Sequence, residues 1–373
     1  MRFQVKKDVL LDSILNVSRA ISTKTPIPAL QGILFEVTND GLYLTGSNTE
    51  YSIKTFIPKS EDLQIEKTGS IVIQSRYIVE IVRKTNDEFI NFEIVDGFLI
   101  KIISSNSEVN LNGINPKEYQ KIDFDLKGKP ITFTAKEFKT IVEQTTFATS
   151  LSENRPLLTG VNFRINGKLL ECTATDSYRL SRKRVKLEET IDKSINIVIP
   201  SKSLNELAKL FIEDEEKLEM YVFGTKVIFK YGTTLLNSRL LEGTYPDTSK
   251  LIPEKFEKVY VVNTQEIFDA TDRASLLSSD HVNNIVNLEV KGSKGYLTSN
   301  TPEVGRIEEK FSVDNKNNEN IKVSFNARYF MDALKALNSL ETEISINDEV
   351  SPFIIRNVHD DTIVQLILPV RTY

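Results

Sequence analysis

Three stretches of this chain, "IVIQSRYIVEIVRKT" (71–85), "IVIPSKSLNELAKLF" (197–211) and "KVSFNARYFMDALKAL" (322–337), follow one pattern. In each, an apolar run typical of a buried strand precedes the spacing of apolar residues that marks an amphipathic helix. When the stretches are aligned on the basic residue that opens each helix, neighbouring copies lie 126 residues apart. This period has the length of a domain, so the sequence predicts three tandem copies of one folding unit.

Two further kinds of segment recur around these stretches in the same order. Each third of the chain opens with a strand and a helical pattern, and each then continues with an apolar strand that ends in a polar turn. Two helices and several short strands per copy indicate α+β domains, which we expect at residues 1–125, 126–252 and 253–373. The opening segments are "FQVKKDVLLDSILNVSRAIS" (3–22), "ITFTAKEFKTIVEQTTFATS" (131–150) and "VYVVNTQEIFDATDRASLLS" (259–278), and the strand-and-turn segments are "LYLTGSNTEYSIK" (42–54), "LECTATDSYRLSRK" (170–183) and "GYLTSNTPEVGRIEEK" (295–310).

The composition limits the class of protein. With 373 residues, of which 40% are hydrophobic and 27% charged, the chain is long enough for two or three domains with apolar cores. No apolar run approaches the roughly 20 residues that cross a bilayer, and the N-terminus lacks the apolar core of a signal peptide, so we expect a cytoplasmic protein. A net charge of −5 argues against a generally basic nucleic-acid-binding protein, but it leaves room for a local basic face.

Residue types that common catalytic and metal sites require are scarce. The only cysteine, Cys172, lies in an apolar alternation and is expected to be a buried strand residue. The two histidines, His281 and His359, are distant in sequence from the polar turn at 176–178, and no phosphate-binding glycine motif occurs. The sequence therefore predicts no metal, no cofactor and no catalytic residue.

The stretch "TATDSYRLSRKR" (173–184) is the strongest candidate for catalysis, because it places Asp176, Ser177 and Tyr178 side by side. The other copies have 45–48 and 298–301 at the same place, where Asn, Asp or Thr side chains satisfy the backbone groups of a turn. We therefore interpret Asp176 as a turn residue. Since the other copies have neither a serine nor a tyrosine at the positions of Ser177 and Tyr178, these two residues are candidates for a role that is special to the middle copy.

The second helix of each copy repeats two basic positions seven residues apart. At 100° per residue, seven residues return to within about 20° of the same direction, so each pair forms one basic face while the apolar residues lie elsewhere on the helix. The same positive face on three helices of an acidic chain suits a polyanion that is bound through its phosphates, without sequence reading. The pairs are Arg76 with Arg83, Lys202 with Lys209, and Arg328 with Lys335.

Three copies do not enclose a ligand by themselves. A head-to-tail homodimer supplies six copies, and a heterologous contact closes into a ring when its rotation fits.

Over essentially its whole length, the chain resembles the bacterial DNA polymerase III beta subunit, the processivity sliding clamp. The resemblance implies a head-to-tail homodimer closed into a six-domain ring, in which helices line a basic hole around duplex DNA and sheets form the outer wall. It also implies a tether for the replicative polymerase, the clamp loader and repair proteins, associated with the nucleoid and without a reaction or cofactor of its own. The motifs that carry the resemblance are "TPIPALQGILFEV" (25–37), "RPLLTGVNF" (155–163), "ATDSYRL" (174–180), "LLEGTYPD" (240–247), "FNARYFMDAL" (325–334) and "LILPVRTY" (366–373).

In this family, the turn that matches 174–180 borders an apolar groove between the second and third domains, where partner proteins insert a short motif containing Leu or Phe. Many members carry Gly and His at the positions of Ser177 and Tyr178. The resemblance implies that Tyr178 forms a wall of the groove and that Arg179 orients the peptide. Carried over residue by residue, the groove comprises Leu158, Thr175, Ser177, Tyr178, Arg179, Leu180, Pro246, Leu251, Asn326, Tyr329, Val350, Pro352, Leu368, Pro369, Val370 and Arg371.

The resemblance also places the contacts that close the ring and touch DNA. It sets Val109 and Leu111 against Leu276 and Leu277 of the next protomer. Lys24 and Ser152 occupy DNA-contact positions of the family, in addition to the basic helix residues.

Two alternatives belong to other classes of protein. A hydrolase using Asp176, Ser177 and Tyr178 would lose turnover on Ser177→Ala, whereas a clamp would change only in peptide affinity. An acidic scaffold that binds proteins without DNA would tolerate charge reversal at Arg76, Lys202 and Arg328.

Overall fold

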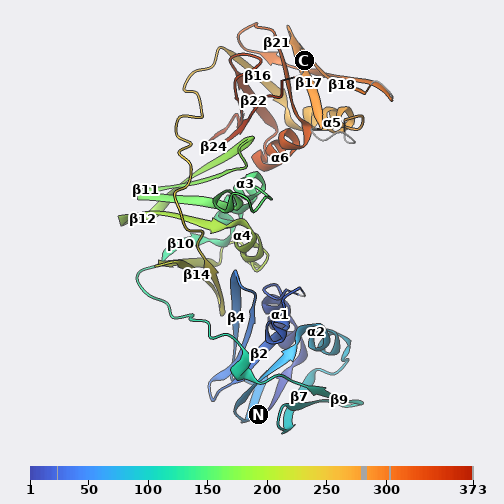
Figure 1. Cartoon of the computed structure of the whole chain (residues 1–373), viewed down its shortest axis with the longest axis vertical. Helices are drawn as coiled ribbons and strands as arrows, with labels where there is room; N and C mark the ends of the chain where they lie inside the picture. Colours follow the sequence, from blue (N-terminus) through green and yellow to red (C-terminus); the bar gives the residue numbers. More distant parts are fainter. Residues whose placement is uncertain (23, 279–283, 302–303, 372–373) are drawn as a thin grey trace. The chain divides into compact units, whose positions relative to one another are not determined.

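Figure 1 shows the computed structural model, in which antiparallel sheets alternate along the chain with helices. The structure describes residues 1–22, 24–278, 284–301 and 304–371. The chain forms two compact units, one from Met1–Phe138 with Lys202–Leu240 and the other from Lys139–Ser201 with Leu241–Tyr373. The middle copy of the repeat therefore contributes residues to both units.

The first unit contains two antiparallel sheets, in the strand orders β5-β1-β7-β8-β9 and β10-β13-β14-β15-β4-β3-β2-β6. The larger sheet joins the first copy to the middle copy where β4 pairs with β15, and the buried hydroxyls of Thr55 and Thr234 lie 3.1 Å apart there. The elements are β1 (Arg2–Lys6), α1 (Lys7–Ser18), β2 (Gly32–Val37), β3 (Gly41–Ser47), β4 (Tyr51–Pro58), β5 (Leu63–Lys67), β6 (Gly69–Gln74), α2 (Ser75–Lys84), β7 (Phe89–Asp96), β8 (Leu99–Ser104), β9 (Ser107–Asn112), β10 (Ile131–Thr134), α4 (Ser201–Ala208), β13 (Lys217–Phe223), β14 (Lys226–Tyr231) and β15 (Thr234–Arg239), with α3 (Ala135–Thr145) running from this unit into the second.

The second unit repeats this design, with sheets in the orders β11-β12-β24-β23-β22-β16-β20 and β19-β18-β17-β21. Here β12 of the middle copy pairs with β24 of the third copy, and Leu180 lies opposite Leu366. The elements are β11 (Gly160–Thr175), β12 (Arg179–Pro200), β16 (Lys258–Asn263), α5 (Thr264–Ser275), β17 (Ile285–Lys291), β18 (Lys294–Thr301), β19 (Gly305–Ser312), β20 (Asp314–Asn315), β21 (Ile321–Asn326), α6 (Ala327–Leu337), β22 (Glu341–Ile346), β23 (Phe353–Asn357) and β24 (Asp360–Ile367).

The predicted repeat is confirmed by where the helices begin. Helices α2, α4 and α6 start at Ser75, Ser201 and Ala327, which are 126 residues apart in both steps. Each copy also has its first helix, namely α1, α3 and α5, so the expected two helices and several strands per copy are present.

Local side chains fix where these helices start. Asn326 caps α6 by accepting a hydrogen bond from the N–H of Tyr329 at 3.1 Å, and Asn263 caps α5 through the N–H of Glu266 at 2.9 Å. Before α3, Thr134 and Glu137 exchange side-chain-to-backbone hydrogen bonds at 3.1 and 2.9 Å, which form a capping box. These caps satisfy N–H groups that have no partner within the helix.

Aromatic and aliphatic side chains fill the cores between helices and sheets. In the first unit the rings of Phe3 and Phe92 stack at 4.9 Å, and in the second the rings of Phe325 and Phe330 lie 4.6 Å apart. Cys172 is fully buried on β11, as predicted, and burial raises the pKa of its thiol. None of the helices in the described part of the chain is long and apolar enough to span a membrane.

Candidate functional site

The turn between β11 and β12 has the structural role that the sequence predicted for Asp176. Its Oδ1 accepts hydrogen bonds from the N–H groups of Tyr178 and Arg179 at 2.9 and 3.0 Å. In the first copy, Asn48 accepts from the residues two and three positions ahead, at 2.8 and 2.9 Å. The Asp176 carboxylate therefore holds the turn together through these hydrogen bonds. Of the two histidines, His281 lies outside the described residues.

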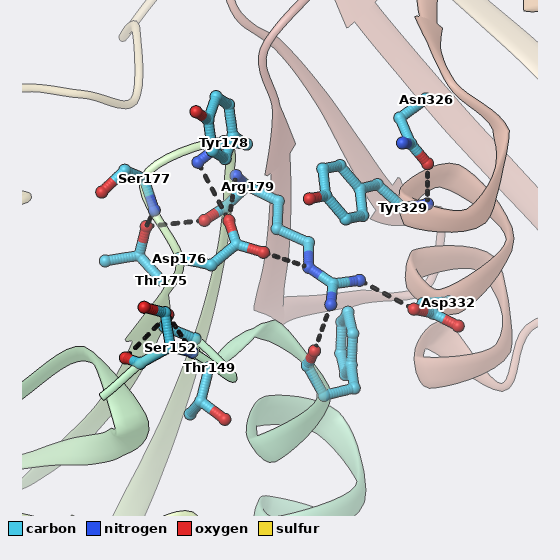
Figure 2. A network of polar contacts seen from close by, with 12 residues as sticks. Thr149, Ser152, Thr175, Asp176, Ser177, Tyr178, Arg179, Asn326, Tyr329 and Asp332 are labelled. Carbon is cyan, nitrogen blue, oxygen red and sulfur yellow. Dashed lines mark hydrogen bonds and ion pairs between the residues drawn. The ribbon is translucent and has the colours of Figure 1, made fainter. Parts of the chain in front are cut away.

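Arg179 leaves this turn and joins the middle copy to α6 of the third copy, as Figure 2 shows. Its Nε donates to Asp176 at 3.0 Å, Nη1 to Asp332 at 2.7 Å and Nη2 to the Phe147 carbonyl at 2.5 Å. The guanidinium also lies 4.4 Å from the centre of the Tyr329 ring, and the side chain is only 11% exposed. These three bonds use one N–H of each guanidinium nitrogen, so one N–H remains on each of Nη1 and Nη2, and the expectation that Arg179 orients a peptide stays a prediction.

An apolar groove of about 660 Å³ opens beside this turn, entirely within the second unit. Leucine and proline side chains dominate its lining, and the N–H of Leu368 donates to the Tyr178 carbonyl at 2.9 Å, which fixes the C-terminal segment against the turn. The groove brings together the predicted residues Leu158, Thr175, Ser177, Tyr178, Arg179, Leu180, Pro246, Leu251, Pro352 and Leu368.

The remaining predicted residues do not line this groove. Asn326 is the cap of α6, and Tyr329 stacks on Arg179. Val350 is 59% exposed in a loop where Asp348 accepts from its N–H at 2.8 Å. Of the C-terminal residues, Pro369 and Val370 are half-buried, Val370 donates its N–H to the Ser324 carbonyl at 2.7 Å, and Arg371 is exposed.

Sequence reasoning missed several residues that line the groove. Arg155 stands directly before Pro156 in the quoted motif "RPLLTGVNF", so the motif itself was a usable signal. Leu366 likewise opens the quoted motif "LILPVRTY", and its pairing with Leu180 across the β12–β24 ladder places it at the groove. The missed residues are Arg155, Pro156, Leu157, Glu242, Thr244, Thr248 and Leu366.

The predicted basic pairs all lie on exposed positions. Most of the apolar residues on the same helices are buried, namely Ile78, Val82, Leu204, Leu207, Phe330 and Leu334, whereas Ile81 is half-buried. One detail of the prediction is wrong: Lys209 lies just beyond α4, which ends at Ala208, because the N–H of Leu210 bonds to the Leu207 carbonyl and tightens the last turn. The six residues are Arg76 and Arg83, Lys202 and Lys209, and Arg328 and Lys335.

Nearby carboxylates moderate part of this positive charge. Glu80 pairs with Arg83, and Glu206 pairs with Lys209 at 2.6 Å. Lys202 lies 3.6 Å from Glu50. Among the described residues, neither Arg76 nor Arg328 has an ion pair with a carboxylate. Their charges are thus available to a ligand.

The other predicted contact residues also lie at accessible places. Lys24 and Ser152 are exposed in loops. Val109 and Leu111 are half-buried on β9, the edge strand of its sheet. Leu276, 66% exposed, and the half-buried Leu277 follow the end of α5.

The fold and the groove together define a class of protein, namely an α+β protein of three repeats with an apolar groove where its second and third copies meet. Family models of the DNA polymerase III beta subunit match the chain in three parts: the N-terminal domain at residues 1–123, the central domain at 132–247 and the C-terminal domain at 249–371. The chain belongs to the DNA polymerase III beta subunit family, the beta sliding clamps, which have no catalytic activity of their own.

Individual relatives agree with this assignment over their full length. The beta sliding clamp of Bacillus subtilis is 42% identical over 378 residues, and that of Staphylococcus epidermidis is 38% identical over 377, with 100% of each chain covered. The crystal structure of the Bacillus subtilis sliding clamp matches with a TM-score of 0.96, and that of the Streptococcus pneumoniae beta chain with 0.95 at 36% identity, again over 100% of both chains. The hydrolase alternative is therefore wrong.

Proposed function

We propose that two copies of this chain close head to tail into a ring around duplex DNA and tether replication and repair proteins to it. The observation that carries this proposal is the exposed basic pair on or directly after the second helix of all three copies, in a chain whose net charge is −5. Because a closed ring keeps its ligand by topology, these side chains need only attract phosphates weakly and without regard to sequence.

The proposed DNA contacts combine helix faces and loops. Exposed lysines and arginines release counterions when they approach phosphates, so the attraction weakens as salt rises. Carboxylates such as Glu80 and Glu206 keep the attraction moderate, which suits a ring that slides. The proposed residues are Arg76, Arg83, Lys202, Lys209, Arg328 and Lys335 on or next to the helices, with Lys24 and Ser152 in the loops.

The proposed ring contact joins two sheet edges. An edge strand presents unpaired backbone groups that pair readily with another strand. Both β9 and β19 are edge strands, and the exposed Leu276 provides an apolar side chain near the end of α5. We propose that Val109 and Leu111 of one protomer contact Leu276 and Leu277 of the next.

The groove is the proposed docking site for partner peptides. Its volume of about 660 Å³ lies within the range of known ligand sites, and its lining is apolar with few polar groups. Such a site favours a short motif with Leu or Phe anchors. We assign to it all the predicted groove residues, with Asn326, Tyr329, Val350, Pro369, Val370 and Arg371 around its margin.

Domain boundaries and location complete the proposal. We place the domains at 1–125, 126–252 and 253–373, in keeping with family models that match 1–123, 132–247 and 249–371. A DNA-bound clamp belongs in the cytoplasm, at the nucleoid.

Retention on DNA tests ring closure directly. The chain would be loaded by the cognate clamp loader with ATP onto closed circular or linear duplex, and retention measured at elevated salt. We expect retention on circles and rapid loss on linear DNA, because salt weakens phosphate attraction equally on both. Equal loss from both, with a loader shown to act on a known clamp, would contradict the proposal.

Charge reversal separates the clamp from a protein-only scaffold. We expect Arg76→Glu, Lys202→Glu and Arg328→Glu together to abolish loading, while peptide binding in the groove continues. A matched control reverses three exposed lysines outside the helices, Lys59, Lys186 and Lys294. If the helix variant and the control load equally well, the basic faces do not meet DNA.

A further inference from the structure

We infer that Arg182, Arg184 and Arg356 form a binding site for the phosphate group of a small ligand, on the face of the second unit's larger sheet that points away from α3. None of these arginines is among the residues that line the apolar groove, so the inference goes beyond the proposed function and does not depend on it.

Strand pairing brings the three arginines to one face of the sheet. Val364 on β24 lies opposite Arg182 on β12 and also opposite Arg356 on β23, so the two arginines flank one valine. Side chains along a strand alternate between the faces, so Arg184 points to the same side as Arg182. Ser181, the residue before Arg182, donates its hydroxyl to a carbonyl of α3. The arginines therefore lie on the opposite face, away from that helix.

One carboxylate serves two of these arginines. Nε of Arg184 lies 2.9 Å from an oxygen of Glu171, and Nε of Arg182 lies 3.9 Å from the same oxygen. The Arg182 side chain is only 16% exposed, and its burial, followed by the charges of Arg184 and Arg356, lowers its pKa. The cluster thus has more positive charge than this carboxylate neutralises.

Arg356 lacks a partner within the described part of the chain. Its Nε is buried and has no hydrogen-bond acceptor there, and its guanidinium lies 5.8 Å from the centre of the Phe256 ring. Glu343 lies opposite Arg356 on β22, but it accepts from the Ser345 hydroxyl at 2.7 Å and forms no ion pair with the arginine among the described residues. A buried donor without an acceptor is costly, so a ligand that supplies acceptors stabilises this arginine.

The first junction offers an internal comparison, because its strands repeat the same row of residues. There Leu235 lies between Lys54 and Lys230, at the places of the valine and its two flanking arginines. Lys230 forms an ion pair with Glu219 at 3.5 Å, and the Lys54 ammonium lies 4.5 Å from the centre of the Tyr43 ring. Both cations of the first row have partners in the protein, whereas the second row retains guanidinium groups for a ligand.

Charge and geometry favour a phosphate. A planar carboxylate matches the fork of one arginine, whereas the guanidinium groups here approach from both sides of one valine. A phosphate ester has a charge of about −1.5 to −2 and three acceptor oxygens, so it binds both groups at once. Arg184 is exposed and forms the open side of the site.

Equilibrium dialysis of the full-length protein against radiolabelled orthophosphate, at an ionic strength kept constant with chloride, tests the inference. We expect one phosphate per chain, with a dissociation constant on the order of 1 mM. Thermal unfolding provides a second measurement, and replacing chloride by about 50 mM phosphate should raise the midpoint by about 2–4 °C. Because phosphate also stabilises proteins in general, the informative quantity is the difference between the parent and its variants.

Two variants and one control make the test specific. Arg182→Gln and Arg356→Gln should each weaken phosphate binding by about tenfold or more, since each removes charge-assisted hydrogen bonds. Arg164→Gln removes an equal charge from an exposed position on β11 and should bind phosphate like the parent. Without phosphate, Arg356→Gln should unfold at no lower temperature than the parent, because it removes a buried donor that lacks an acceptor. A merely structural arginine would instead lose stability in both buffers.

Phenyl phosphate distinguishes the two sources of the phosphate group. Binding of both phenyl phosphate and orthophosphate indicates a site open to the phosphate of a larger molecule, and binding of orthophosphate alone indicates a site for the free ion; either result supports the inference. Succinate binding as tightly as phosphate, or unchanged phosphate binding in both variants, overturns it. Since these measurements use neither DNA nor a peptide, their failure leaves the proposed ring and groove unaffected.

Discussion

The chain contains two equivalent junctions between copies, and only one of them has the apolar groove. At the second junction, where β12 meets β24, Leu180 lies opposite Leu366. At the first junction, where β4 meets β15, the register puts Ser52 opposite Asn237. The hollow beside this first pair measures about 200 Å³ and is lined mostly by polar and charged side chains, compared with about 660 Å³ of mainly apolar groove at the second.

Polar contacts close the first junction. Lys226 binds the side chain of Asp123 at 2.7 Å, and Asn237 donates to the Asp123 carbonyl at 2.9 Å, so the linker after the first copy is tied to the strands beneath it. Both linkers also contain a buried tyrosine, at positions 126 residues apart. Tyr119 donates its hydroxyl to the Thr45 carbonyl at 3.2 Å, and the Tyr245 hydroxyl accepts from the N–H of Thr175 at 3.1 Å. Equivalent backbone at the two junctions thus forms a large apolar groove or a small polar hollow, depending on a few side chains.

The largest expected effect is on peptide affinity, when the apolar pair at the second junction is replaced by the polar residue types of the first. Leu180→Ser with Leu366→Asn should weaken binding of an apolar peptide by about 100-fold, because two buried anchors of the groove become polar. Anisotropy measures the affinity. The control is Leu187→Ser on the same strand, where the leucine is 5% exposed compared with 2% for Leu180. If Leu187→Ser lowers peptide affinity as much as the double variant, general destabilisation explains the loss.

A second prediction compares how much two ion pairs stabilise the protein, namely Arg179 with Asp332 on α6 and Arg19 with Glu206 on α4. Arg179 is 11% exposed and bonds to Asp332 at 2.7 Å, whereas Arg19 is 35% exposed and lies 3.7 Å from Glu206, the equivalent acid. Arg179→Met should cost about 3 kcal/mol in the free energy of unfolding, since it removes a largely buried cation that bonds to Asp176, Asp332 and the Phe147 carbonyl. Arg19→Met should cost less than about 1 kcal/mol. Urea unfolding of both variants measures this, and equal losses would contradict the reasoning.

A third prediction uses the feature that both junctions share. Burial raises the pKa of Tyr119 and Tyr245, with Glu36 adding to the effect at Tyr119 and Asp176 at Tyr245. Because the folded-state pKa lies above the unfolded value of about 10, the stabilisation is complete below pH 10 and is lost as the pH rises beyond it. Tyr119→Phe with Tyr245→Phe should therefore flatten the fall in stability above pH 10. Thermal unfolding between pH 8 and 11 checks this, and an unchanged slope would assign the alkaline loss to other groups.

Much of this comparison could be predicted from the sequence, because repetition reveals local structure. The 126-residue period located the helices, and the turn chemistry of Asp176 agreed with that of Asn48. Cys172 was correctly placed in a buried strand.

The rest depends on contacts between residues far apart in the chain. Leu366 reaches the groove because β24 pairs with β12, and Arg179 finds Asp332 on another copy of the repeat. No local pattern marks such pairings. The sequence did not predict that α4 ends before Lys209 either, because this end depends on the hydrogen bond from the Leu210 N–H to the Leu207 carbonyl.

The smallest expected effect concerns the backbone of the two turns. Ser177→Gly should raise the free energy of unfolding by up to about 1 kcal/mol, because glycine adopts the φ of 81° without strain and the lost hydrogen bond to Arg155 is exposed. Thr49→Gly, at the equivalent place in the first copy, should instead lower it by about 0.5–1 kcal/mol, since it only adds freedom to the unfolded chain. Urea unfolding of the two single variants measures the sign of each change in the free energy of unfolding. If Ser177→Gly does not stabilise the protein, the left-handed backbone at Ser177 carries no cost. If both variants stabilise it equally, the gain does not come from that backbone.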